Sequence, residues 1–235
     1  MSDMSLKQQI RSFLRYRLPV AVVPKWSIEW WQGVPEFTLN AHHYVVFCHT
    51  HNCGWPPSRM TERAVEVRLA DRWLSYVLGP VIEIGAVTPY YWPSRVARVV
   101  DPADGHPLVT DRVSLFDIDT TGLNVLCLST LEHIGSGEYG QPLDPTGPTK
   151  ALAHLTANCR DYLITVPFGY NPDIDASVFG DASPVPAKFL MRSADGNDWR
   201  ECSAHEARVP PSRRSGMDHF AYANGLAVMA KGRGI

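Results

Sequence analysis

The sequence lacks any marked excess of charge of one sign. Its 235 residues include 22 Lys and Arg against 24 Asp and Glu, which gives a formal net charge of −2. Proteins that bind nucleic acids usually carry a broad basic field that neutralises phosphates. Nucleic acid is therefore not expected as a partner.

Long apolar segments and a paired set of cysteines are absent as well. No run approaches the roughly 20 apolar residues that cross a bilayer, and near the N-terminus only the short run 18–24, interrupted by Pro19, is apolar, with no small-residue cleavage site after it. The five cysteines are an odd number, scattered through a chain large enough to fold without disulfides. We therefore expect a cytoplasmic protein with reduced thiols and no membrane contact.

What is present is an ordinary globular composition, with 45% hydrophobic and 20% charged residues. A chain of this length fits one large domain. From Val81 onward, short apolar runs alternate with helix-like or turn-rich stretches, which is typical of βα units around a parallel sheet. We expect an α/β domain over residues 61–235, with residues 1–60 as an appendage or lid packed on it.

The expected elements follow from the spacing of apolar residues. Helices are predicted over 61–78, ended by Gly79-Pro80, and over 148–160, where a crossover must join two parallel strands. The stretch 169–186 is rich in Gly, Pro, Asn and Asp and is expected to form a long loop. The last two strands are expected to form an edge hairpin or an antiparallel addition. The expected strands are 81–84, 96–100, 125–128, 162–166, 187–192 and 225–230.

The first sixty residues are rich in aromatic residues and His, and only the region 44–48 is strand-like. Within them, Cys48, His49, His51 and Cys53, with His42 and His43 just before, are residue types that bind zinc. Their spacing is too tight for the usual paired ligands, and adjacent strand residues point to opposite faces. We therefore predict no metal site, and expect some of these side chains to line a lid.

Polar residues follow several of the expected strands. In doubly wound sheets, ligands bind at the carboxyl ends of the strands, near the point where the strand order reverses. Glu83 lies inside the first apolar run and Gly85 follows it, Asp101 ends the second run, and Ser129 and Thr130 follow the run 125–128. A buried acid costs several kcal/mol unless it is paired, so Glu83 requires an explanation.

These residues resemble a known family. Glu83 followed by Gly85 resembles the first motif of class I S-adenosylmethionine (SAM)-dependent methyltransferases. The segment 129–135, Ser-Thr-Leu-Glu-His-Ile-Gly, resembles the motif that follows the fourth strand in many small-molecule methyltransferases, and the tail to Pro145 is similar to a bacterial branch associated with glycan or surface-polysaccharide genes. The resemblance covers about residues 61 to 167. It implies a Rossmann-like, mostly parallel sheet of seven strands with helices on both faces and a late antiparallel strand.

The resemblance also implies a role for individual residues. SAM would be the cofactor, with Asp101 on the ribose hydroxyls, since one carboxylate can accept from both. The adenine-contacting acid would be Asp111 or Asp117, and the sequence leaves that choice open. The remaining residues expected to contact the cofactor are Glu83, Gly85, Ala86, Ser129 and Thr130.

On the substrate side, Glu132 and His133 would be catalytic, with His133 as the base that draws a proton from a hydroxyl. A simpler account, compatible with this one, has Ser129 or Thr130 capping a helix with Glu132 closing a capping box. Thr61-Glu62-Arg63 is either a charged helix start or a contact to a substrate or cofactor carboxylate. The expected walls of the substrate pocket are Tyr90, Tyr91 and Tyr139.

The function expected from the resemblance is methyl transfer to an oxygen or nitrogen of a small molecule, such as a sugar or glycan precursor, with a homodimer as one option for assembly. The loop has the single Gly85 where the family usually has Gly-x-Gly-x-Gly. That departure favours an alternative, a catalytically silent methyltransferase-like module that binds a nucleoside or a protein partner. A dinucleotide-dependent oxidoreductase is disfavoured, because no Gly-x-Gly-x-x-Gly follows the first strand.

Overall fold

The computed structural model describes residues 36–45, 61–92, 94–180, 183, 185–193, 198–213 and 221–232. Most of the expected appendage lies outside these residues, including the expected zinc-ligand types at Cys48, His49, His51 and Cys53. No helix of the described residues is both long enough and apolar enough to cross a membrane.

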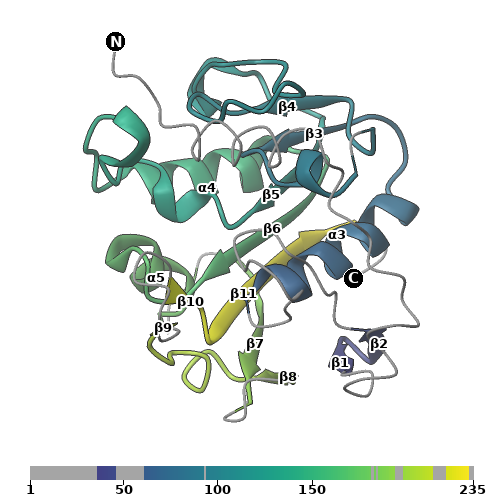
Figure 1. The fold of residues 1–235 in the computed structure, drawn as a ribbon, viewed down its shortest axis with the longest axis vertical. Helices are drawn as coiled ribbons and strands as arrows, with labels where there is room; N and C mark the ends of the chain where they lie inside the picture. The colour runs from purple at the N-terminus through teal and green to yellow at the C-terminus, as the bar shows by residue number, and fades with distance from the viewer. Residues whose placement is uncertain are drawn as a thin grey trace, which may run out of the picture.

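A mixed sheet of seven strands forms the centre of the molecule (Figure 1). Its strands are β3 (Val81–Ile84), β4 (Arg98–Val100), β5 (Asn124–Leu128), β6 (Asp161–Pro167), β7 (Lys188–Arg192), β8 (Trp199–Cys202) and β11 (Gly225–Lys231). They lie in the order β4-β3-β5-β6-β11-β7-β8. The first four are parallel, whereas β11 is antiparallel to both β6 and β7. The expected α/β class is confirmed, with a mostly parallel core and late antiparallel strands.

The strands of the parallel core are buried on both faces because their sequences are continuous apolar runs. Every residue of β5 is buried, and Leu126 and Cys127 lie opposite Leu163 and Ile164 of β6. Successive residues point to opposite faces, so Val125 and Cys127 belong to one hydrophobic cluster while Leu126 and Leu128 belong to another. The run 124–128 thereby supplies the core on both sides of the sheet.

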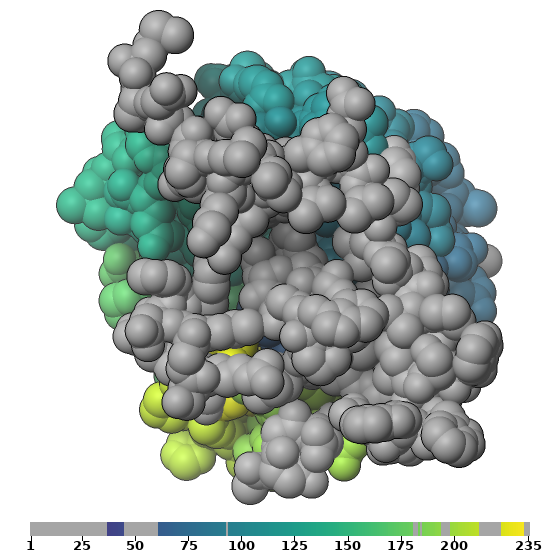
Figure 2. Space-filling view, viewed as in Figure 1, coloured from purple at the N-terminus to yellow at the C-terminus, as the bar shows by residue number. Residues whose placement is uncertain are grey.

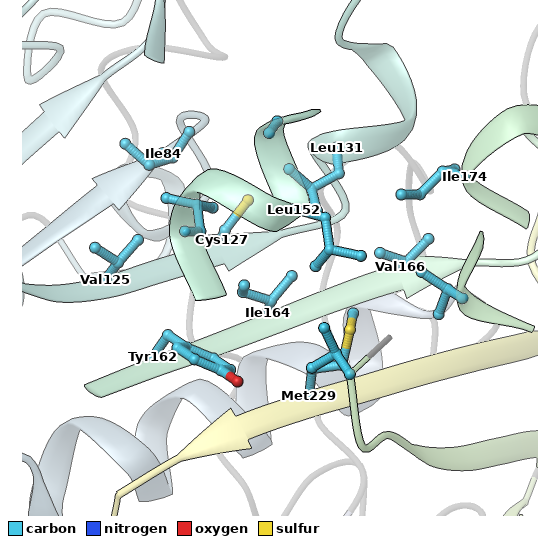
Figure 3. Packing of buried hydrophobic residues seen from close by; sticks show 14 of the residues in the cluster. Ile84, Val125, Cys127, Leu131, Leu152, Tyr162, Ile164, Val166, Ile174 and Met229 are labelled. Atoms are coloured by element: carbon cyan, nitrogen blue, oxygen red, sulfur yellow. The ribbon is translucent and has the colours of Figure 1, made fainter. Parts of the chain in front are cut away.

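Helices cover both faces. The helix α3 (Arg63–Tyr76) packs Leu69 and Trp73 in the cluster that contains Leu126. On the other face, α4 (Gly147–Asn158) and the short α5 (Pro172–Val178) pack with Cys127 and Ile164 (Figure 3). The buried residues contributed by α4 and α5 include Leu152, Leu155, Ile174 and Val178.

The described residues of the connections from β3 to β4 and from β4 to β5 form no α-helix. In each connection they form one three-residue 3₁₀ helix, η1 (Thr88–Tyr90) and η2 (Leu115–Asp117) respectively. A parallel bridge joins Val100 to Asp111 beyond β4. In the space-filling view, residues near 100–115 and the α4 region lie toward one end, and residues of the C-terminal strands lie at the other (Figure 2).

The expected helices 61–78 and 148–160 are confirmed by α3 and α4. The first ends at Tyr76, two residues before the predicted end, and Gly79 follows with a φ of +89°. All six expected strands are present, each with boundaries within two residues of those predicted. The signals that located them were the apolar runs and the glycine and proline stops.

One expectation about the C-terminal part was wrong. The stretch 169–186 is not all loop, because Pro172 occupies the first turn of α5, where a proline fits, and the side chain of Asn171 caps the helix by accepting from the backbone N–H of Asp173 at 3.0 Å. Of the two arrangements expected for the late strands, the antiparallel addition is confirmed, because β11 pairs antiparallel with β6 and β7 inside the sheet. An edge hairpin is formed by β7 and β8, the second of which was not predicted.

Of the N-terminal region, the structure describes one hairpin, β1 (Glu36–Leu39) with β2 (His42–Val45). The predicted strand-like region 44–48 overlaps β2 only at its start. Phe37 and Tyr44 stack with ring centroids 4.8 Å apart, and both belong to the α3-side core. The hairpin also contacts β8, where the backbone N–H of Asn40 donates to Glu201. This part of the appendage packs on the domain.

A last, two-stranded ladder precedes β11. Its strands are β9 (Ser212–Arg213) and β10 (Ala221–Tyr222), which pair antiparallel. It lies outside the seven-stranded sheet, and it delivers Tyr222 to the cavity described next.

Candidate functional site

A cavity of about 650 Å³ opens at the carboxyl ends of β3, β4 and β5. β3 is flanked by β4 on one side and by β5 on the other, so the chain direction across the sheet reverses here, which is where doubly wound sheets bind ligands. Of the residues predicted for the site, those that line this cavity are Gly85, Ala86, Tyr90, Asp101, Ser129, Thr130, Glu132, His133 and Tyr139.

Glu83 lies beneath the cavity and organises the loop after β3. Its Oε1 accepts the backbone N–H groups of Val87 at 3.1 Å and Thr88 at 2.8 Å, while the Thr88 hydroxyl donates to its Oε2. The carboxyl group is fully buried, and burial raises its pKa to about 7 against the opposing effect of these hydrogen bonds. The acid therefore shapes the loop directly rather than lining the cavity.

Gly85 brings this loop against the end of β5. Its φ is +84°, a conformation that glycine adopts without steric cost. A Cβ at this position would lie 2.1 Å from Oγ1 of Thr130 and 2.7 Å from its Cγ2. The backbone N–H of Gly85 also donates to the Val100 carbonyl at 2.9 Å. Only a residue without a side chain allows the ends of β3 and β5 to approach in this way.

Asp101 joins two loops across the floor of the cavity. Its Oδ2 accepts the N–H of Ala86 at 3.0 Å, and its Oδ1 accepts the N–H groups of Ala103 and Asp104, both at 2.8 Å. Asp104 in turn accepts the hydroxyl of Tyr90, at 2.9 and 3.0 Å from its two oxygens. One oxygen of Asp101 carries a single backbone donor, so it retains the capacity to accept from a ligand hydroxyl.

The structure does not bring Asp111, Asp117 or Tyr91 to the cavity lining that the described residues form. Asp111 pairs with Arg98 through two bonds of 2.8 and 3.1 Å, and this hydrogen-bonded guanidinium lowers the pKa of the carboxyl. Asp117 is exposed on η2, whereas the residues just before it, 114–116, line the cavity. Neither acid therefore stands at the wall where the adenine contact was expected.

The turn after β5 is held by a buried acid that was not predicted. Ser129 has a φ of +40°, an unfavourable conformation for a residue with a side chain. Its hydroxyl donates to Glu66 of α3, and the Thr165 hydroxyl donates to the same oxygen at 2.5 Å. The Ser129 N–H also donates to Thr165 Oγ1 at 3.1 Å. Glu66 is completely buried and pairs with Arg63 at 2.9 Å.

The predicted capping box is wrong. Residues 131–133 form only a 3₁₀ turn, and neither side chain required for the box makes its bond. The Thr130 hydroxyl turns back to donate to the Leu128 carbonyl at 3.0 Å, and the Ser129 hydroxyl is used by Glu66.

His133 lies between two carboxylates. Its Nδ1 is 2.7 Å from Oε2 of Glu138, and its Nε2 is 3.7 Å from Oε1 of Glu132. An ionised Glu138 can only accept, so it selects the tautomer with the proton on Nδ1 and leaves Nε2 as an acceptor. The ring also meets Tyr139 edge-on, with centroids 5.5 Å apart. Glu138 was not predicted. The sequence feature that could have pointed to it is its position in the Gly-rich turn just after His133.

One wall of the cavity is formed by five residues from four parts of the chain. They are Glu62 and Arg63 at the start of α3, Glu132, Tyr170 after β6, and Tyr222 of β10. Burial raises the pKa of Glu62 and raises that of Glu132 well above its ordinary value, and Glu66 adds to both shifts. Of these residues, the sequence pointed to Glu132 and to the helix start with Arg63. Tyr170 and Tyr222 carried no signal, because they come from segments far apart in the chain.

Metal ligation receives no support from the described part of the chain, where no group of three or more His, Cys, Asp or Glu side chains could hold an ion. Comparisons with protein-family models, with curated proteins and with solved structures found no match to this chain.

Proposed function

We propose that the protein is a SAM-dependent methyltransferase with a Rossmann-like class I fold, acting on an oxygen or nitrogen atom of a small molecule. The observation that carries the proposal is the cavity at the reversal point of the sheet, where the Gly85 loop and Asp101 meet the Ser129–Gly135 segment. The parallel core followed by the antiparallel β11 also agrees with the fold that the resemblance implies.

The residues present fit this cofactor. The cavity of about 650 Å³ lies within the roughly 300–1,000 Å³ usual for small-molecule sites. Gly85 keeps its loop clear of a side chain, and Asp101 offers a carboxylate oxygen that can accept from ribose hydroxyls. Acidic residues outnumber basic ones around the cavity, which suits a ligand with positive charge.

In this proposal, Gly85, Ala86 and Asp101 hold the cofactor, with Ser129 and Thr130 at the end of β5. Bound there, the cofactor supplies an electrophilic methyl group. The protein contributes mainly by holding the acceptor atom close to that group and in line with it, which in general lowers a barrier by several kcal/mol.

His133 would act as the general base. Its Nδ1 is engaged by Glu138, so Nε2 is the nitrogen free to take a proton from an acceptor hydroxyl or ammonium. Glu138 is a positioning residue, since it holds the ring and stabilises the imidazolium that forms. The Tyr139 ring packs against the imidazole at an interplanar angle of 78° and so helps to fix its orientation.

The test is calorimetry with SAM and with S-adenosylhomocysteine. We expect binding to the wild-type protein, loss of binding in Asp101→Ala, and retained binding in Asp111→Ala, which removes an acid outside the cavity. The absence of binding at millimolar cofactor, or equal effects of the two substitutions, would overturn the proposal. Cofactor binding with no transfer to any acceptor would instead identify a catalytically silent module.

A further inference from the structure

The wall of the cavity that lies toward β6 and β11 has a composition that the cofactor site does not explain. The residues that hold the cofactor in the proposed function stand on β3, β4 and the end of β5. Another group of lining residues comes from other elements: Glu62 and Arg63 at the start of α3, Glu132 in the turn after β5, Tyr170 after β6 and Tyr222 on β10. We refer to these five residues as the acidic wall.

Apart from Nη1 of Arg63, which lies 2.9 Å from Glu66 in an ion pair, two buried polar atoms of the acidic wall have no hydrogen-bond partner among the described residues. They are Oε2 of Glu132, whose side chain is 2% exposed, and the hydroxyl of Tyr222, a residue that is 4% exposed. A buried polar group has lost its hydrogen bonds to water, and leaving it without another partner costs free energy. Nearly all buried polar groups in proteins are therefore hydrogen-bonded. Both residues line the cavity, so a ligand there can supply the missing contacts.

Carboxyl groups outnumber guanidinium groups around these atoms. Three carboxyl groups, those of Glu62, Glu66 and Glu132, stand near two guanidinium groups. Arg63 is paired with Glu66 at 2.9 Å, and Arg192 is bonded to Asn224 and lies over the Tyr222 ring, 5.4 Å from its centroid. Among the described residues, no Lys or Arg side chain forms an ion pair with Glu132.

Other groups that face Glu132 do not change this balance. His133 Nε2 is 3.7 Å from its second oxygen, and the buried Cys127 thiol holds its proton because its own pKa is raised well above normal. The hydroxyl of Tyr170 likewise has a raised pKa and stays neutral. Burial, with repulsion from Glu66 and Glu62, raises the pKa of Glu132 well above its ordinary value, which favours the protonated form of this carboxyl group in the protein alone.

We propose that the acidic wall binds an ammonium group of the acceptor, so that the substrate is an amine-bearing small molecule such as an amino sugar. An ammonium group has three donors and no acceptor, which matches Glu132 Oε2, the Tyr222 hydroxyl and the carboxylate of Glu62. The faces of Tyr170 and Tyr222 add attraction for a cation. A carboxylate or phosphate would instead face three carboxyl groups, and a neutral sugar would supply no positive charge to balance Glu132 when it ionises.

Binding has a proton balance that can be measured. When the ammonium group enters, Glu132 loses its proton to solvent and becomes the counter-ion. Calorimetry in two buffers of different ionisation enthalpy should therefore report a proton released for each amine bound at neutral pH. Binding should also weaken as the pH falls, because Glu132 then retains its proton more strongly.

The experiment compares three sugars that differ mainly in one group: glucosamine, glucose and glucuronate. Each is titrated by calorimetry into protein saturated with S-adenosylhomocysteine. We expect glucosamine to bind at least about tenfold more tightly than glucose, with proton release, and glucuronate not to bind. Glu132→Gln should abolish both the preference and the proton release. Asp71→Asn, which changes an acid outside the cavity, should retain both.

Equal binding of glucose, tighter binding of glucuronate, or no binding of glucosamine would overturn the inference. Competition between glucosamine and S-adenosylhomocysteine would also overturn it, since the wall would then belong to the amino end of the cofactor. The inference rests on the proposed function, because it assumes that the bound amine is the methyl acceptor. The experiment can nevertheless contradict either one without the other. If the protein does not bind S-adenosylhomocysteine at all, the proposed function is wrong, and the same sugars titrated into the protein alone still test the acidic wall.

Discussion

The carboxylate of Glu83 accepts two hydrogen bonds from Thr88, one from its backbone N–H at 2.8 Å and one from its hydroxyl. The two residues are five positions apart, and both are buried beneath the loop that carries Gly85. In the loop after β3, the Glu83 carboxylate therefore accepts backbone N–H groups that have no carbonyl partner in an α-helix. The shape of the proposed cofactor loop depends on this pair.

Glu83 should make stability depend on pH. Its pKa is about 7 in the folded protein against about 4.5 in the unfolded chain, so the unfolded state loses its proton first as the pH rises. The contribution of Glu83 is complete below pH 4.5 and is lost between pH 4.5 and 7, by about 3 kcal/mol. The measurement is urea unfolding of wild type and Glu83→Gln from pH 4.5 to 8. The difference between the two curves isolates Glu83 from the other buried acids, and a difference that is constant with pH would contradict the assignment.

Replacing Gly85 by Ala should lower stability and abolish cofactor binding. The new Cβ would lie 2.1 Å from Thr130 Oγ1 in a backbone with a φ of +84°, so both the loop and the end of β5 must move. Overpacking of this kind costs about 1–3 kcal/mol, before the cost of the positive φ. The measurement is thermal unfolding together with calorimetry.

The double variant Gly85→Ala/Thr130→Ala provides the control. It removes the two closest atoms but leaves the Thr130 Cβ at 2.9 Å and the positive φ, so we expect partial recovery of stability. Full stability in the single variant would show that the loop is not constrained in this way.

Glu66→Ala should be among the most destabilising substitutions in the protein. It leaves Arg63 without its partner at 2.9 Å and removes the acceptor of the Ser129 and Thr165 hydroxyls. Breaking a buried ion pair from one side costs about 3–5 kcal/mol. The matched control is Asp71→Ala, which breaks the partly exposed pair with Arg95 and should cost no more than about 1 kcal/mol. Similar unfolding midpoints for the two variants would refute the role given to Glu66.

His133 and Glu138 should contribute unequally to turnover. His133→Ala removes the base, and we expect kcat to fall about 100-fold or more with little change in cofactor affinity. Glu138→Gln keeps the size of the side chain but loses the negative charge beside Nδ1, so a smaller loss of about tenfold in kcat is expected. The measurement is steady-state kinetics of both variants, and an unchanged kcat in Glu138→Gln would remove Glu138 from the mechanism.

Much of the sheet could be read from the sequence because its strands are buried on both faces. A run such as Asn124–Leu128 must be apolar throughout, and that pattern is visible without any knowledge of its neighbours. The short elements α5 and β8 were missed for the opposite reason. Seven or four residues give too little periodicity, and Pro172 resembles a loop residue until the helix that it begins is known.

The candidate site divides in the same way. Glu83 and Asp101 stood out because a polar residue inside or at the end of an apolar run is conspicuous, and His133 stood out through the resemblance of the segment 129–135. Glu66 did not, because it lies in the middle of an amphipathic helix, where a charged residue is ordinary. Its burial arises only when α3 packs on the ends of β5 and β6.

The sequence by itself determined the α/β class, the main strands and helices, and the polar ends of the strands at Gly85, Asp101 and Ser129. These depend on local patterns of apolar and turn-forming residues. Tertiary structure alone decided that Asp111 pairs with Arg98 away from the cavity, and that Glu62, Glu132 and Tyr222 share a wall. Such contacts join residues up to 160 positions apart, and their energies depend on burial, which no local pattern records.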